Sequence, residues 1–102
     1  MKKEIILEGN NFSNEKELYD EVESKFTKGL EWKIGRNLNA FNDVLRGGFG
    51  IYEYEEPVKV IWKNFEKSKK ELGTIKISKD RILLDAIMDI FKDHKHIELV
   101  LE

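Results

Sequence analysis

The sequence has no cysteine, and only two of its 102 residues are histidine. Without cysteine the chain forms no disulfide bond, carries no thiol nucleophile and offers no thiolate ligand for zinc. Two histidines are too few for a histidine-rich metal centre. We therefore expect a protein with no bound metal and no cofactor. A chain of this length buries enough surface for a single core to be stable without a metal or a disulfide bond.

Long apolar runs are also missing from the beginning of the chain. The apolar run that follows Met1-Lys2-Lys3 is only Ile5-Ile6-Leu7. An export signal needs about 7–15 apolar residues, and a membrane-spanning helix needs about 20. The sequence therefore predicts a soluble, cytoplasmic protein with no membrane partner.

A strong charge of one sign is absent as well. The 18 basic and 20 acidic side chains leave a net charge of −2, which excludes a polyanion binder held by bulk charge. One segment, residues 57–76, is nevertheless rich in lysine. Its lysines lack the interleaved arginine and aromatic residues that grip phosphates and stack bases, so we expect a solvated face and no nucleic-acid partner. The six lysines are Lys59, Lys63, Lys67, Lys69, Lys70 and Lys76.

Apolar spacing and cap residues divide the chain into alternating strands and helices within one domain, residues 1–102. Leu18, Val22 and Phe26, for example, recur every four residues and predict a helix that buries this stripe. Strands are expected at 4–7, 58–62 and 97–101, and helices at 15–27, 38–46, 65–72 and from Ser78 onward. Each of the first three helices is expected to begin at an asparagine cap and to end at glycine. In chain order, the caps are Asn14, Asn37 and Asn64, and the ends are Gly29, Gly47-Gly48 and Gly73.

The order of these elements indicates the fold class. Strands that alternate with helical crossovers pair in parallel, and the connections are right-handed. We therefore expect an α/β fold, a three-stranded parallel sheet packed with about four helices mainly on one face.

Two groups of polar residues are candidates for a functional surface. The first is a strip on the short helix at 38–46 that runs into the glycine pair: Asn39, Asn42, Asp43 and Arg46. The second is Asp85, Asp89 and Asp93, which recur every four residues of the last helix. Like charges at this spacing repel by a few tenths of a kcal/mol, so the stripe either tolerates a small cost or serves as a negative surface.

The two histidines, His94 and His96, lie at the junction of the last helix with the last strand. On a strand this spacing would place both rings on one face, as a metal site could use. With no third ligand in prospect, we expect a pair of solvated side chains, one of which interacts with the end of the helix.

Residues 34–50, IGRNLNAFNDVLRGGFG, resemble the barstar family of ribonuclease inhibitors, whose members carry a similar helix followed by a glycine loop. The order of the later elements is similar too: a strand ending in Trp62, a helix opening with Phe65-Glu66-Lys67-Ser68, a long helix and a final strand. The resemblance covers nearly the whole chain. It implies a three-stranded parallel sheet and a monomeric, intracellular protein without enzymatic activity.

The resemblance also implies a partner and a surface. Barstar-like proteins bind a basic secreted ribonuclease one-to-one, and acidic side chains on the second helix take the positions of RNA phosphates. Asp43 matches the acidic residue that enters the nuclease active site. Asn37, Leu38 and Gly47 match contact or loop-shaping positions of the family, Asn39 matches a further contact position, and Asp93 falls near the acidic contact on the last helix. Asn42 and Gly48 stand at two more positions of this surface.

Departures from the family pattern point to a different target, either another nuclease or another basic toxin. Asn39 stands where the family often has aspartate, Asn42 where its type member has an aromatic residue, and Gly48 where that member has tryptophan. Lys33 or Ile34 replaces a tyrosine pair at the start of the motif.

Other interpretations remain open. Asn37 can be only a helix cap, and Asp43 can form an ordinary exposed ion pair with Arg46. The chain can also be a regulatory or scaffold module that keeps the fold and binds a protein that is not a nuclease. RNA binding through the lysines of residues 57–76 is the third alternative.

Overall fold

A three-stranded parallel sheet organises the molecule. The computed structural model describes residues 2–28 and 37–102. Its sheet contains β1 (Lys3–Glu8), β2 (Val58–Lys63) and β5 (Ile97–Leu101) in the order β1-β2-β5. Leu7 pairs with Trp62, and Trp62 pairs with Leu101. The predicted α/β class and the parallel sheet are confirmed.

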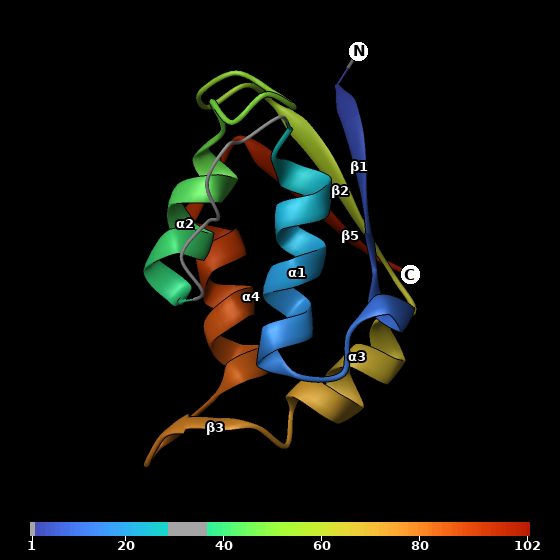
Figure 1. Cartoon of the computed structure of the whole chain (residues 1–102), viewed down its shortest axis with the longest axis vertical. Helices are drawn as coiled ribbons and strands as arrows, with labels where there is room; N and C mark the ends of the chain where they lie inside the picture. Colours follow the sequence, from blue (N-terminus) through green and yellow to red (C-terminus); the bar gives the residue numbers. More distant parts are fainter. Residues whose placement is uncertain (1, 29–36) are drawn as a thin grey trace.

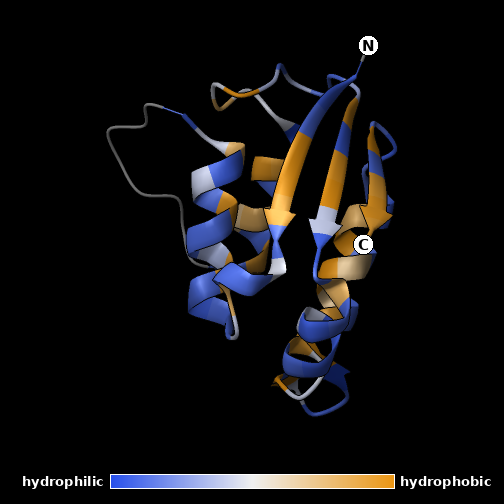
Figure 2. Cartoon of the chain, turned by 90° about the vertical axis from the view of Figure 1, so that its right-hand side faces the viewer, coloured by the Kyte–Doolittle hydropathy of each residue, from blue (hydrophilic) through white to orange (hydrophobic). Residues whose placement is uncertain are grey.

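The strand order determines where the helices lie. Both crossovers step across the sheet in the same direction, so right-handed connections place their helices on the same face. Figure 1 shows α1 (Glu15–Phe26), α2 (Leu38–Arg46) and α4 (Leu83–Asp93) on this one side of the sheet, and Figure 2 shows the sheet in front of the helices. The core forms between the two layers, and within residues 2–28 and 37–102 the largest fully buried side chain is that of Trp62.

Helix α1 (Glu15–Phe26) follows a short 3₁₀ turn, Gly9–Asn11. Asn14 caps it as expected, because its Oδ1 accepts a hydrogen bond from the Glu17 amide at 2.9 Å. The Glu17 carboxylate in turn accepts one from the Ser13 amide at 2.9 Å. The helix ends with Thr27 as its C-cap, and Gly29, the predicted end, lies outside the described residues.

Helix α3 (Phe65–Leu72) has the predicted bounds but not the predicted cap. Asn64 adopts a left-handed conformation with φ of 57° and makes no capping hydrogen bond. Its side-chain amide instead donates to the Glu8 carboxylate at 2.7 Å, which ties the start of α3 to the end of β1. On the inner face, the Trp62 indole N–H donates to the buried Ser68 hydroxyl at 3.0 Å.

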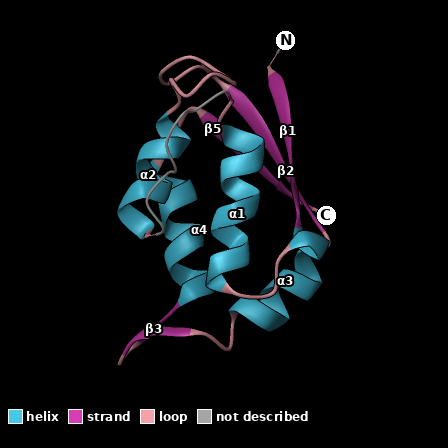
Figure 3. Cartoon of the chain, in the orientation of Figure 1, coloured by secondary structure: helices cyan, strands magenta, loops and turns pink. Residues whose placement is uncertain are grey.

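The last helix begins later than the sequence predicted. Residues 76–82 form a small antiparallel hairpin of β3 (Lys76–Ser78) and β4 (Arg81–Ile82), apart from the main sheet (Figure 3). Helix α4 then runs from Leu83 to Asp93. A hairpin forms here because polar and apolar residues alternate at 76–78: Ile77 is half-buried between exposed Lys76 and Ser78. In the second strand, Ile82 is half-buried after exposed Arg81.

Candidate functional site

Helix α2 (Leu38–Arg46) separates its residues into two faces. Phe41, Val44 and Leu45 are buried in the core, at the helical spacing that the sequence predicted. The N-cap is Asn37, whose Oδ1 accepts a hydrogen bond from the Ala40 amide at 2.8 Å. Residues 34–36 of the motif lie outside the described residues. The buried face fixes the helix against the molecule and leaves the other face to solvent.

Asp43 is the carboxylate on the exposed face of α2. Its side chain is 66% exposed, and its Oδ1 lies 3.7 Å from Nη1 of Arg46. The arginine side chain is itself 44% exposed, so this ion pair is well hydrated and contributes little to stability. Asp43 is therefore held loosely and is accessible to a partner.

A glycine turn ends α2 and begins the loop that leads to β2. Gly47 and Gly48 both have positive φ, 98° and 88°. The Tyr52 hydroxyl donates to the Leu45 carbonyl at 2.7 Å, and the Gly48 amide donates to the Tyr52 carbonyl at 2.8 Å. These bonds fold the loop back on the end of α2, so the helix and loop form one surface.

The two glycines differ in the space available for a side chain, so their alanine variants form a matched pair. A Cβ on Gly47 would overlap the Glu53 carbonyl and the Tyr52 ring, whereas a Cβ on Gly48 would meet no atom within 4 Å. We expect Gly47→Ala to lower the free energy of unfolding by about 2–3 kcal/mol, through backbone strain plus steric overlap. Gly48→Ala carries only the backbone strain, about 1 kcal/mol. Urea unfolding of both variants measures the difference, and equal losses would contradict a close approach at Gly47.

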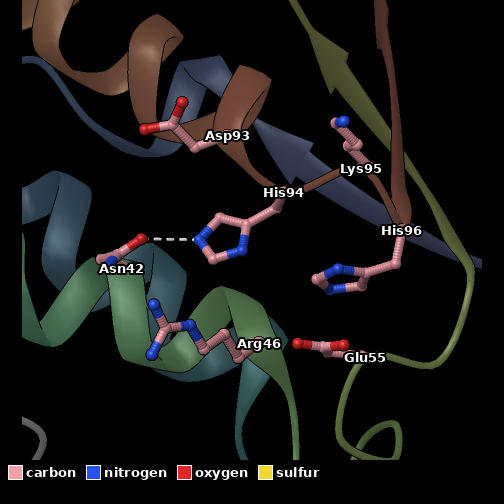
Figure 4. A pocket seen from close by; sticks show the side chains of 7 residues that line it. All are labelled: Asn42, Arg46, Glu55, Asp93, His94, Lys95 and His96. Atoms are coloured by element: carbon pink, nitrogen blue, oxygen red, sulfur yellow. Dashed lines mark hydrogen bonds between the residues drawn. The ribbon is translucent and has the colours of Figure 1, made fainter.

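A polar pocket opens where α2 meets the α4–β5 junction. Its volume is about 380 Å³, and Figure 4 shows its lining side chains on these elements and on the loop before β2. The lining residues are Asn42, Arg46, Glu55, Asp93, His94, Lys95 and His96. The structure therefore brings together three of the predicted site residues, Asn42, Arg46 and Asp93. The sequence analysis did not predict the other four lining residues as site residues: Glu55, His94, Lys95 and His96.

The two histidines attach α2 to this junction. Nε2 of His94 lies 2.6 Å from Oδ1 of Asn42, and Nε2 of His96 lies 2.9 Å from the Leu45 carbonyl oxygen. His94 is only 7% exposed, so the prediction of two solvated rings is wrong for this residue. No local signal distinguished it, because its burial depends on a helix about fifty positions earlier in the chain.

The same packing determines the charge of His94. Burial lowers the pKa of His94 below its usual 6.5, and the positive charges of His96 and Arg46 lower that pKa further. Asp93 and the bond to Asn42 act in the opposite direction but do not outweigh burial. The ring is therefore neutral at pH 7, and its hydrogen bond to Asn42 connects the end of α4 to α2.

Three other predicted site residues, Asn37, Leu38 and Asn39, do not line this pocket. Asn37, Leu38 and Asn39 line a second hollow at the opposite end of α2, together with residues of α1 and β3. Asp89 forms an ion pair with Arg81 at 2.8 Å, so part of the predicted aspartate stripe is already neutralised. Of the three aspartates in that stripe, Asp93 lines the pocket beside α2.

The charge of the surface formed by α2 and its loop is negative. Residues 37–57 contain four carboxylates and one basic side chain, Arg46. Glu56 is partly neutralised by Lys3 at 3.7 Å, whereas Glu53 and Glu55 are exposed. No three histidine, aspartate or glutamate side chains of the described residues are placed to hold a metal ion. Chemically, this arrangement suits the binding of a positively charged protein surface.

Comparison with known proteins agrees with the geometry. A family model described as Barstar (barnase inhibitor) matches residues 2–102 of the chain. No curated protein matches the sequence. Within residues 2–28 and 37–102, no helix has the length and apolar character needed to cross a bilayer. The family match spans every element that builds the surface of α2 and its loop.

Proposed function

Because the chain belongs to the barstar family of barnase inhibitors, we propose that it inhibits a basic ribonuclease of the barnase type or a related basic toxin. In this proposal the α2 surface, which we define as the exposed face of Leu38–Arg46 with residues 47–57, blocks the active site of the partner. The carboxylates of this surface take the positions of RNA phosphates and face arginine and lysine side chains of the enzyme.

The observation that carries the proposal is the exposure of Asp43 on a rigid helix within an acidic surface. The carboxylate has one weak partner of its own at 3.7 Å, so little is lost when a guanidinium or ammonium group of another protein replaces it. The helix behind it is fixed by buried Phe41, Val44 and Leu45, which makes the surface preorganised for binding.

One observation favours the second candidate, a regulatory or scaffold module with a different protein partner. The Asn42 side chain is engaged by His94 within the chain itself, and Asn39 carries no charge. Asp43 is therefore the only acidic residue within Leu38–Arg46. A partner that requires several carboxylates on this helix would bind weakly, and a less basic protein would suit it better.

The deciding experiment measures RNA hydrolysis by a barnase-type ribonuclease with increasing amounts of the purified chain. We expect complete inhibition at a one-to-one ratio and an association rate that falls about tenfold or more as the salt concentration rises from ~0.05 to ~0.5 M. Stopped-flow fluorescence gives that rate. Undiminished hydrolysis at excess inhibitor, together with capture from native cells of a partner without nuclease activity, would favour the module instead.

A further inference from the structure

The two outer edges of the sheet differ in how their backbone groups are satisfied. At the β1 edge, the Glu8 amide donates to the Glu21 carboxylate at 2.9 Å, and Lys25 Nζ donates to the Ile6 carbonyl at 3.4 Å. Both side chains come from α1, and they form an ion pair with each other at 2.8 Å. The molecule therefore closes the β1 edge with its own side chains.

The β5 edge has no such cover among the described residues. The His96 carbonyl accepts from Val58, and the Glu102 amide donates to Trp62, so even-numbered residues of this segment face β2. In a parallel ladder the alternate residues point the other way, which turns the amides and carbonyls of Leu99 and Leu101 to the open side. The order β1-β2-β5 makes β5 an outer strand of the sheet, next to the C-terminus that Figure 2 marks. An open edge of this kind is a template for an added strand.

An apolar groove runs beside this open edge, between α4 and β5. Its volume is about 350 Å³. Leu101, which lines it, is 43% exposed, and among the described residues only Tyr54 is also a large exposed apolar side chain. The apolar residues that line the groove are Met88, Phe91, Ile97, Leu99 and Leu101. Strand addition needs two features, and both are present side by side. The unpaired backbone groups provide hydrogen bonds for affinity, and the apolar groove accommodates every second side chain of the added strand.

The rim of the groove indicates the charge of the occupant. Lys92 and Lys95 line it, both are exposed, and neither forms an ion pair with a carboxylate of the described residues. We propose that the β5 edge binds an extended segment of a partner protein that alternates apolar and acidic side chains. The apolar side chains enter the groove, and the acidic ones lie beside Lys92 and Lys95. This surface is distinct from the α2 surface, and the proposal does not depend on the ribonuclease.

The probe is a short capped peptide that alternates valine and glutamate, added to the full chain and followed by NMR. We expect the peptide to shift the amide signals of Leu99 and Leu101 and to slow their hydrogen exchange. A peptide that alternates valine and lysine is the matched control and should bind more weakly. Lack of binding by the glutamate peptide, or binding without protection of these two amides, would overturn the proposal.

Two variants test the open strand and the charge of the rim. Leu101→Pro removes an amide N–H that faces the open side and leaves every hydrogen bond to β2 in place. The unfolding midpoint should therefore change little, while peptide binding should be lost. Lys92→Glu should weaken peptide binding about three- to tenfold, whereas Lys79→Glu, in the distant hairpin turn, should leave it unchanged. Equal effects of the two charge reversals would contradict the role of the rim.

A second copy of the chain is the competing occupant, and the same experiment identifies it. If Leu99 and Leu101 are protected without peptide, and the protection increases with protein concentration, the edge binds another copy and the proposal is wrong. Sedimentation velocity over the same concentrations should instead show a monomer throughout.

Discussion

Replacement of Asp43 by alanine is expected to weaken the complex with the ribonuclease by about 2–4 kcal/mol, or roughly 30- to 1,000-fold in the dissociation constant. The reason is that a desolvated carboxylate among basic groups of the partner is a typical hot spot, and its removal leaves those groups buried without a counter-charge. Isothermal titration calorimetry or inhibition kinetics at low salt measures the loss.

The same substitution should barely change the folded protein. The Asp43 side chain is 66% exposed and its one ion pair, with Arg46, is long, so we expect the free energy of unfolding to change by less than about 0.5 kcal/mol. Glu66→Ala, an exposed carboxylate on α3, is the matched control and should change neither affinity nor stability. If Asp43→Ala bound the ribonuclease as tightly as the unmodified chain, Asp43 would be an ordinary surface residue and the α2 surface would lose its main support.

The second large effect concerns the opposite face of the same helix. Phe41 is 1% exposed, and its ring lies edge-on to that of Phe91, with centroids 5.6 Å apart. We expect Phe41→Ala to lower the free energy of unfolding by about 3–5 kcal/mol, because it removes buried apolar surface and leaves a cavity between α2 and α4. For a domain whose total stability is about 5–15 kcal/mol, this is a large part.

Denaturant unfolding followed by circular dichroism measures this loss. Asn39→Ala, an exposed change on the same helix, is the control and should stay within about 0.5 kcal/mol of the unmodified chain. Phe41→Leu should fall between the two, since leucine fills most of the space. A loss under about 1 kcal/mol for Phe41→Ala would mean that the core closes around the cavity and that α2 is not anchored by this ring.

The sequence predicted the sheet, helix α2 and the bounds of α3 because each depends on a local pattern. Apolar runs mark the strands of a parallel sheet, and apolar residues at helical spacing mark the buried face of a helix. Asn37 caps α2 for the same reason, since the bond from the Ala40 amide spans three residues. The solvent exposure of Asp43 could be predicted because the position of a residue on an amphipathic helix determines whether it faces the solvent.

Predictions failed where two local patterns compete or where a distant residue decides the outcome. Ser78 resembles a helix cap, but alternating residues on both sides of Lys79-Asp80 favour a hairpin, and α4 begins at Leu83. Asn64 also resembles a cap, yet its side chain is taken by Glu8 on β1, 56 positions earlier. Such a bond has no sequence signature, because it depends on which strands become neighbours.

The sequence alone determined the strands of the main sheet, the helices α1, α2 and α3, and which face of α2 carries the charge. Only the tertiary structure decided what surrounds that face. Asn42 and His94 lie 52 positions apart, and their contact joins α2 to the end of α4. Burial at this junction lowers the pKa of His94. The same packing closes one sheet edge with Glu21 and Lys25 and leaves the β5 edge open. Burial and edge exposure are properties of the assembled layers, since desolvation and backbone pairing depend on neighbours that local spacing does not specify.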